Sequence, residues 1–192
     1  IRVQRAEGPQ TDLRFSFRGP GERSDRFPAL RVLADVLDGG PTGRLPERLV
    51  DSGLAYSARA ALTGFPDVSL LEIDVTVAHG KLPRVVDAVF GLIGSLRAGV
   101  SDDELVRGRL RRQHALRALR DDAAAQAEDA VRSLLFDLPP DPVRCEQEDA
   151  VDAEAIGHLE RRNLFPPFFE LEGRRRGIEL DPDEKRQNEG DE

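Results

Sequence analysis

The sequence predicts an α+β domain in which helices pack on one face of a mostly antiparallel sheet. Two stretches, around 13–18 and 68–78, alternate apolar and polar residues as half-buried strands do. Two others, 28–38 and 82–98, carry apolar residues at helical spacing. The order strand, helix, short helix, two strands, helix, long helix and final helix suits this fold class. At 192 residues the chain can bury the core of one substantial domain.

The first strand is expected from Leu13 and ends at the Gly-Pro-Gly turn of residues 19–21. Ser24 or Asp25 is expected to cap the next helix. Pro28 falls in its first turn, where a missing N–H is tolerated. The side chains expected to face the core are Leu13, Phe15 and Phe17 from the strand and Leu30, Leu33, Val36 and Leu37 from the helix.

A glycine turn follows this helix. Gly39 and Gly40 should stop the helix, because only glycine adopts left-handed backbone conformations cheaply. Thr42 is expected to cap a short helix with Gly43 and Arg44 in its first turn. Such a turn could hold a ligand or merely reverse the chain.

A β-hairpin is predicted next, with strands at Leu54–Leu62 and Val68–Ala78 and a turn at Gly64–Asp67. After Gly80 we expect a helix of about 16 residues that ends at Gly99. The second strand is expected to turn four residues inward: Leu71, Ile73, Val75 and Val77. The apolar residues that the helix carries are Val85, Val86, Val89, Phe90, Ile93 and Leu96.

The remaining chain begins with a capping box, in which Ser101 and Glu104 satisfy each other's backbone donors. It opens a long helical region that reaches about Phe136 and is interrupted near Asp121. Beyond a proline-rich loop, the expected elements are a helix over Ala153–Arg161 capped by Asp152, a weak edge strand over Leu164–Leu171, and a disordered charged tail over 173–192. Residues 1–172 would then form a single domain.

Composition excludes several functions. Lys and Arg total 28 against 36 Asp and Glu, and this net charge of −8 argues against a general nucleic-acid binder. No apolar run approaches the roughly 18 residues that would span a membrane. Cys145, the only cysteine, leaves no internal disulfide and no cysteine-based zinc site. Arg greatly outnumbers Lys, of which only Lys81 and Lys185 occur, and this indicates a GC-rich bacterial genome. Because the chain contains no Met, we expect it to be a piece of a longer product. Its location, periplasmic or cytoplasmic, stays open.

The glycine turn and its surroundings resemble a family signature, Gly-Gly-Gly-x-Ser-Ser-Arg-Leu … Gly-Leu-Ala-Tyr. It is the signature of the pitrilysin/insulinase family of zinc metallopeptidases, which are built from repeated α/β half-domains. The resemblance points to the half that lacks the metal, of the C-terminal type, and extends from about Gln10 to Leu164. Matching residues are Gly39, Gly40, Thr42 (where the family usually has Ser), Arg44, Leu45, Gly53, Leu54, Ala55 and Tyr56.

This chain lacks the residues of a zinc peptidase. The family's motif is H-x-x-E-H, with two His one helical turn apart, whereas His79, His114 and His158 are widely separated. The helix that would carry the motif contains no ligand. We therefore expect no catalytic residue, no metal and no cofactor in this chain, and zinc in a partner half. An independent hydrolase finds no support in the sequence.

The resemblance implies one substrate contact. In catalytic members, an Arg and a Tyr on either side of the short helix hold the substrate carbonyl near the zinc. Tyr56 falls on the Tyr position, but Leu49, or Val50 after a one-residue deletion, stands where the Arg is expected. Tyr56 therefore either contacts the substrate or packs at the start of its strand. Arg44 matches a different, structural arginine.

The arginines of the long helix are interpreted as a solvated or partner-facing ridge, because acidic residues bracket them. The resemblance as a whole implies a non-catalytic half-domain that pairs with a zinc-bearing half, in the same polypeptide or another, around a peptide substrate. The alternative is a pure assembly module of the same fold that binds no peptide. The ridge consists of Arg107, Arg109, Arg111, Arg112, Arg117 and Arg120.

Overall fold

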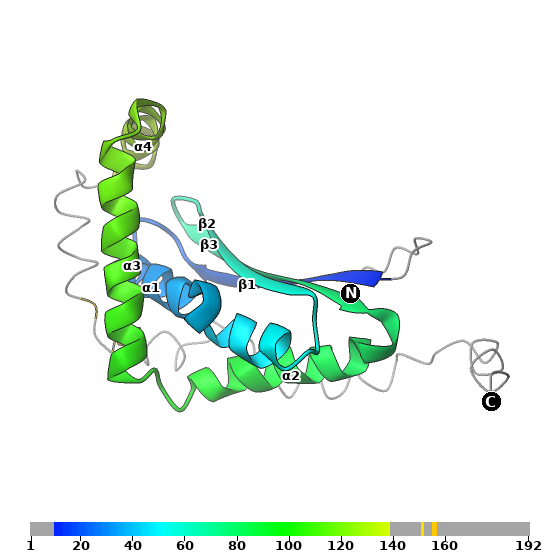
Figure 1. The fold of residues 1–192 in the computed structure, drawn as a ribbon. Helices are drawn as coiled ribbons and strands as arrows, with labels where there is room; N and C mark the ends of the chain where they lie inside the picture. The colour runs from blue at the N-terminus through cyan, green and yellow to red at the C-terminus, as the bar shows by residue number, and fades with distance from the viewer. Residues whose placement is uncertain (1–9, 139–150, 152–154, 157–192) are drawn as a thin grey trace, which may run out of the picture.

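The computed structural model describes residues 10–138, 151 and 155–156. Ten elements follow one another along this part of the chain (Figure 1). They are β1 (Gln10–Pro20), α1 (Phe27–Leu37), η1 (Gly40–Thr42), η2 (Pro46–Asp51), β2 (Ser57–Gly64), β3 (Val68–Ala78), η3 (His79–Lys81), α2 (Leu82–Leu96), α3 (Asp102–Arg120) and α4 (Ala123–Phe136).

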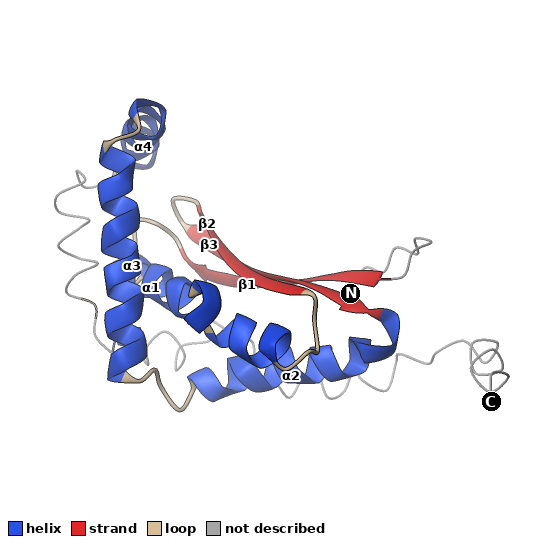
Figure 2. Cartoon of the chain, viewed as in Figure 1, coloured by secondary structure: helices blue, strands red, loops and turns tan. Residues whose placement is uncertain are grey.

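The sheet is antiparallel, with strand order β1-β3-β2, so the hairpin's second strand lies in the middle (Figure 2). Strand β3 alternates as the sequence predicts, because a strand turns successive side chains to opposite faces. Its inward residues are at most 2% exposed: Leu71, Ile73, Val75 and Val77. The opposite face carries a polar network in which Arg14 makes a bidentate pair with Asp74, at 2.6 and 3.0 Å.

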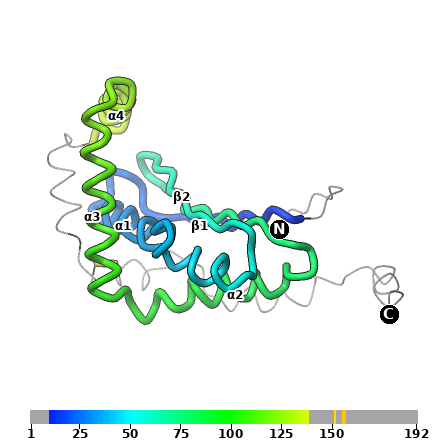
Figure 3. The backbone as a smooth tube through the Cα atoms, viewed as in Figure 1, coloured from blue at the N-terminus to red at the C-terminus, as the bar shows by residue number. Residues whose placement is uncertain are grey.

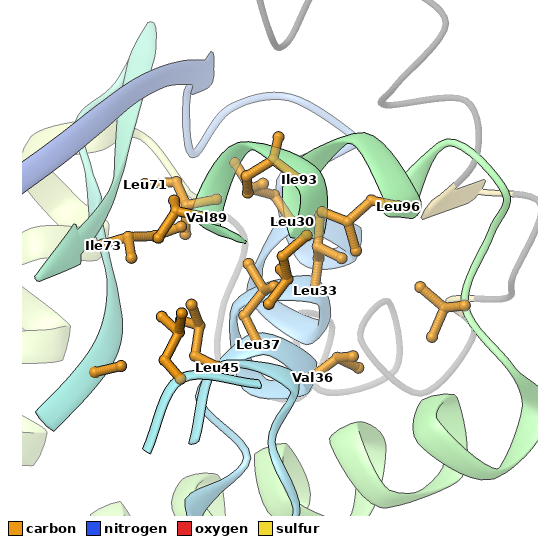
Figure 4. Close-up of a cluster of buried hydrophobic side chains, with 14 of the residues drawn as sticks. Leu30, Leu33, Val36, Leu37, Leu45, Leu71, Ile73, Val89, Ile93 and Leu96 are labelled. Carbon is orange, nitrogen blue, oxygen red and sulfur yellow. The ribbon is translucent and has the colours of Figure 1, made fainter. Parts of the chain in front are cut away.

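Helices α1 and α2 pack against the sheet, and α3 packs on α1 (Figure 1). Between the sheet and these two helices lies the main core, in which Leu30, Leu33 and Leu37 of α1 meet Ile93 and Leu96 of α2 (Figure 4). This arrangement confirms the α+β class. The tube in Figure 3 shows α3 rising steeply from the end of α2, with α4 at its far end.

Helix α4 follows a break at Asp121 and Asp122, close to where the sequence places it, and the Asp122 carboxylate caps the new helix. No residue of α4 is buried. Polar contacts with the β1–α1 loop attach it instead. Glu22, whose side chain is only 2% exposed, pairs with Arg132 at 3.1 Å, and Arg23 donates to the Phe136 carbonyl at 2.7 Å.

Two details of the predicted elements are wrong. Helix α1 begins after Arg26, because Ser24 closes the preceding turn with its carbonyl and does not cap the helix, and Asp25 does not cap it either. Strand β2 begins at Ser57 and not at Leu54, since the Ala55 N–H is bonded to Leu49 of the short helix. Helix α2 buries five residues, Val85, Val89, Leu92, Ile93 and Leu96, and Val86 and Phe90 are half-buried.

Several expectations fall on residues that the structure does not describe. They are the edge strand at Leu164–Leu171, the tail at 173–192, and most of the helix at Ala153–Arg161, of which only residues 155 and 156 are described.

Candidate functional site

The glycine turn joins α1 to the short helix η2. Helix α1 ends at Leu37, and the left-handed residue is Gly40, with φ of 59°, rather than Gly39, with φ of −59°. Gly39 is needed for space, because a Cβ there would lie 2.8 Å from the Gly43 Cα. Gly39 and Gly43 thus pack against each other across the turn.

Thr42 does not cap the short helix. It lies in the 3₁₀ turn η1, where its hydroxyl donates to the Gly39 carbonyl at 3.3 Å. The π-type segment η2 (Pro46–Asp51) follows two helical residues, Arg44 and Leu45, and the Glu47 N–H donates to the Gly43 carbonyl at 3.1 Å. The capping expected of Thr42 is therefore wrong, and this residue closes the turn instead.

Arg111 of α3 clamps the turn from outside. Its guanidinium donates to the Asp35 carbonyl at 3.1 Å and to the Gly39 carbonyl. The Asp35 carbonyl lies in the last turn of α1 and the Gly39 carbonyl just beyond it, and a cation suits this end of the helix dipole. Arg111 therefore fixes the turn and is not part of a free arginine ridge.

Arg44 ties the turn to the start of α3. Its guanidinium forms a bidentate pair with Glu104, at 2.6 and 2.8 Å, and donates to the Gly99 carbonyl at 3.1 Å. Both side chains of the pair are less than one-fifth exposed. The hydrogen bonds from Arg44, aided by Ser101, lower the pKa of Glu104 from 4.5 to about 2, against the opposing effect of burial. Arg44 therefore links the glycine turn to the start of α3.

Asp38 connects the same turn to the sheet. Burial raises the pKa of its carboxyl group, and three neighbours partly oppose this rise. They are a hydrogen bond from the Ala60 N–H and the positive charges of Arg59 and Arg111. Since β2 is an edge strand of the described sheet, Asp38 satisfies a backbone donor there.

The hollow beside the turn has a volume of only about 10 Å³. That is room for about one water molecule. Of the two interpretations of the glycine turn, chain reversal is therefore favoured over ligand binding.

Tyr56 stands at the entry to β2 with 63% of its surface exposed. Its backbone N–H donates to the Thr76 carbonyl at 2.9 Å, which fixes the residue against the sheet. The position where an arginine is expected is closed, because Leu49 is fully buried and Val50 is half-buried in the core. Tyr56 is thus accessible, whereas core residues occupy the two positions at which the arginine was expected.

The histidines do not assemble a metal site. His79 bonds to Thr11, with 2.5 Å between Nδ1 and the hydroxyl oxygen, His114 is exposed on α3, and His158 lies outside the described residues. Within residues 10–138, 151 and 155–156, no group of three or more His, Cys, Asp or Glu side chains could hold a metal ion. None of the helices in this same part of the chain is long and apolar enough to cross a membrane.

The arginines of the α3 ridge have different surroundings in the structure. Arg111 clamps the turn, and the Nε of Arg109 is buried without a partner among the described residues. Arg107 and Arg117 remain exposed. Sequence reasoning missed the clamp because no local pattern marks which arginine of a helix faces a neighbouring element.

Comparisons with known proteins agree with this geometry. The family model described as "Peptidase M16 inactive domain" matches residues 1–111. A relative, an uncharacterized zinc protease of Mycobacterium leprae (strain TN), is 28% identical over 115 residues. That match covers 58% of this chain but only 26% of the relative, so the chain spans about a quarter of that protein's length.

Solved structures share the fold. The inactive peptidase domain of a proposed zinc protease from Bordetella parapertussis superposes with a TM-score of 0.73 at 17% identity, covering 86% of this chain and 92% of that one. A protease from Helicobacter pylori gives a TM-score of 0.75 at 15% identity, covering 83% of this chain and 40% of that one. The peptidase M16 inactive domain from Pseudomonas fluorescens gives 0.61 at 19% identity, covering 78% and 37%. The chain therefore belongs to the family of peptidase M16 inactive domains.

Proposed function

We propose that this chain is the non-catalytic half of a zinc-dependent peptidase and pairs with a zinc-bearing half to close a peptide-binding chamber. Residues 1–172 would form the half-domain, and residues 173–192 a disordered tail. The observation that carries the proposal is Tyr56, a large aromatic residue that remains 63% exposed beside an intact, well-anchored turn. A tyrosine kept only for packing would be expected to bury its ring.

The expected role of Tyr56 is to donate a hydrogen bond to a substrate carbonyl. Such a bond contributes most where negative charge develops in the transition state. The partner half would supply the zinc, since the described residues of this chain do not provide a ligand set. With Leu49 buried at the arginine position, Tyr56 would act without its usual companion.

The same burial of Leu49 favours a second candidate function, a pure assembly module. In that case the fold is kept to support the catalytic half, and Tyr56 contacts no peptide. The two functions differ in what removal of the Tyr56 hydroxyl would do.

Tyr56→Phe should lower peptide turnover by the reconstituted pair about tenfold, which corresponds to about 1.4 kcal/mol. Stability should stay nearly unchanged, because the side chain is largely exposed. The measurement is steady-state cleavage of a peptide library by the two halves together, with thermal unfolding of each variant.

Thr63→Val is the matched control, because it removes a hydroxyl from an exposed position at the other end of β2. It should leave turnover unchanged. Unchanged turnover in Tyr56→Phe as well would favour the assembly module over the peptide chamber.

The isolated chain should bind no stoichiometric zinc. A tetrahedral site needs three or four suitable ligands, which the described residues do not bring together. Elemental analysis after mild dialysis tests this, with the zinc-bearing half as the positive control. About one tightly held zinc per chain would contradict the assignment of the metal to the partner.

A further inference from the structure

The exposed ring of Tyr56 takes its position from the backbone of the loop that carries it. This loop, residues 52–56, joins η2 to β2 and is drawn in tan in Figure 2; we call it the Tyr56 loop. Two backbone hydrogen bonds anchor its second half. The Ala55 N–H donates to the Leu49 carbonyl at 2.7 Å, and the Tyr56 N–H donates to the Thr76 carbonyl at 2.9 Å. How firmly the loop is held therefore decides where the Tyr56 hydroxyl lies.

The first half of the Tyr56 loop is open. Gly53 has a left-handed φ of 70°, and its N–H donates to the Val50 carbonyl at 2.8 Å. A Cβ at Gly53 would have no described atom within 4 Å, so the described residues do not pack against this side of the backbone. Glycine also allows the chain more backbone conformations than any other residue. A further contact is needed to hold this half of the loop in one place.

Lys81 makes that contact from the start of α2. Its Nζ donates to the Gly53 carbonyl at 2.8 Å, across 28 positions of the chain. Lys81 follows the end of β3, the strand that accepts the Tyr56 N–H at Thr76. The bond from Lys81 and the bond to Thr76 therefore hold the two halves of the Tyr56 loop against neighbouring parts of the chain.

The charge of Lys81 favours this contact. Lys81 is the residue before the first turn of α2, where a cation opposes the helix dipole. The Gly53 carbonyl lies just beyond the last residue of η2, Asp51, and a cation suits that end of a helix. The ammonium group is thus poorly placed for α2 and well placed for the Tyr56 loop.

We infer that Lys81 is a positioning residue for Tyr56. Its bond to the Gly53 carbonyl holds the Tyr56 loop and so keeps the Tyr56 hydroxyl in one place. The consequence for peptide turnover rests on the proposed function, in which this hydroxyl donates to a substrate carbonyl. The effect of Lys81 on the loop does not depend on that function.

The fluorescence of Tyr56 tests the effect on the loop, because the chain has one tyrosine and no tryptophan. Time-resolved anisotropy of the full chain reports how freely this ring moves. Lys81→Met keeps the aliphatic stem but removes the donor, so it should increase the amplitude of the fast ring motion. Exchange of the Ala55 and Tyr56 amides should accelerate about tenfold, because the loop opens more often without a hydrogen bond from a charged group.

Two matched variants accompany Lys81→Met. Lys81→Arg keeps a positively charged donor and should leave the anisotropy and the amide exchange of the Tyr56 loop close to those of the unmodified chain. Arg84→Met removes another exposed cation from the first turn of α2 and should change neither measurement.

Turnover by the reconstituted pair tests the consequence for catalysis. Lys81→Met should lower kcat about fivefold, less than Tyr56→Phe, and leave KM unchanged, because the hydroxyl acts mainly in the transition state. In a Tyr56→Phe background, Lys81→Met should have no further effect, since the hydroxyl that Lys81 positions is then absent. Lys81→Arg should restore most of kcat, and Arg84→Met should leave it unchanged.

Three results would overturn the inference. The first is unchanged ring motion and amide exchange in Lys81→Met. The second is unchanged turnover in Lys81→Met where Tyr56→Phe lowers it. The third is a loss of turnover in Lys81→Met that persists in the Tyr56→Phe background, which would mean that Lys81 does not act through Tyr56. If Tyr56→Phe itself leaves turnover unchanged, the proposed function fails, and the anisotropy and exchange results alone decide whether Lys81 holds the loop.

Discussion

Arg44→Ala should lower the free energy of unfolding by about 3 kcal/mol at neutral pH, because it breaks a largely buried ion pair and leaves the Glu104 carboxylate without its arginine. The arginine joins the glycine turn to the start of α3 through Glu104, and to the Gly99 carbonyl that precedes α3. Urea unfolding followed by circular dichroism measures the loss. The turn itself should become more accessible to hydrogen exchange.

The same pair predicts how stability depends on pH. The pKa of Glu104 is lowered in the folded chain, from 4.5 to about 2. A lowered pKa contributes stability that is fully present above pH 4.5 and is lost as the pH falls towards 2. We expect this loss to be about 2 kcal/mol, since both side chains keep some contact with solvent. In Arg44→Ala, the acid-dependent loss from this group should largely disappear.

Arg14→Ala is the matched control for Arg44→Ala. Arg14 makes a bidentate pair of similar geometry with Asp74, but its side chain is 62% exposed on the sheet surface. Solvent screening makes such pairs weak. A much smaller loss is therefore expected for Arg14→Ala. Equal losses in the two variants would show that burial does not decide the strength of the Arg44 pair.

Glu22→Gln should destabilise the chain by about 2–3 kcal/mol and release α4 before the rest of the domain. Glu22 is a buried carboxylate between two helices, 3.1 Å from Arg132 of α4 and 3.8 Å from Arg31 of α1. Removing its charge takes a buried anion away from the part-buried guanidinium groups of Arg31 and Arg132 and weakens the link between α1 and α4. Since α4 has no buried residue of its own, it should lose amide protection first.

Two further variants test whether the Glu22 carboxylate attaches α4. Gly64→Ala should act like Glu22→Gln, because a Cβ at residue 64 would lie 2.1 Å from the Glu22 carboxylate and displace it. Glu72→Gln alters a more exposed carboxylate on the sheet, with 23% of its side chain accessible, and should leave α4 unaffected. If α4 keeps its protection in Glu22→Gln, its attachment does not depend on this ion pair.

The sequence predicts the main elements well because their signals are local. Alternation places the inward residues of β3, and the Ser101–Glu104 capping box starts α3, with both of its hydrogen bonds present. The interruption near Asp121 is also local, since Asp122 caps the helix that follows. Each of these features depends on residues close together in the chain.

The contacts that hold the glycine turn and those that attach α4 join residues far apart in the chain, and the sequence does not reveal them. Arg111 reaches Asp35 and Gly39 from more than 70 positions away. Glu22, in a loop, meets Arg132 at a separation of 110 positions. Nothing in a run of arginines marks which one is used in this way. The match to the family placed Arg44 and Tyr56, but their partners and exposure required the structure.

The bond between Asp38 and the Ala60 N–H has a consequence for self-association through the sheet. An exposed edge strand offers unpaired backbone groups on which another chain can grow, which leads to aggregation. By occupying a donor near the middle of β2, Asp38 interrupts that template without adding a strand. The carboxylate at the end of α1 thus occupies one backbone donor on the edge of the described sheet where another chain could pair. Because burial raises the pKa of Asp38, this hydrogen bond loses its charged acceptor as the solution becomes acidic.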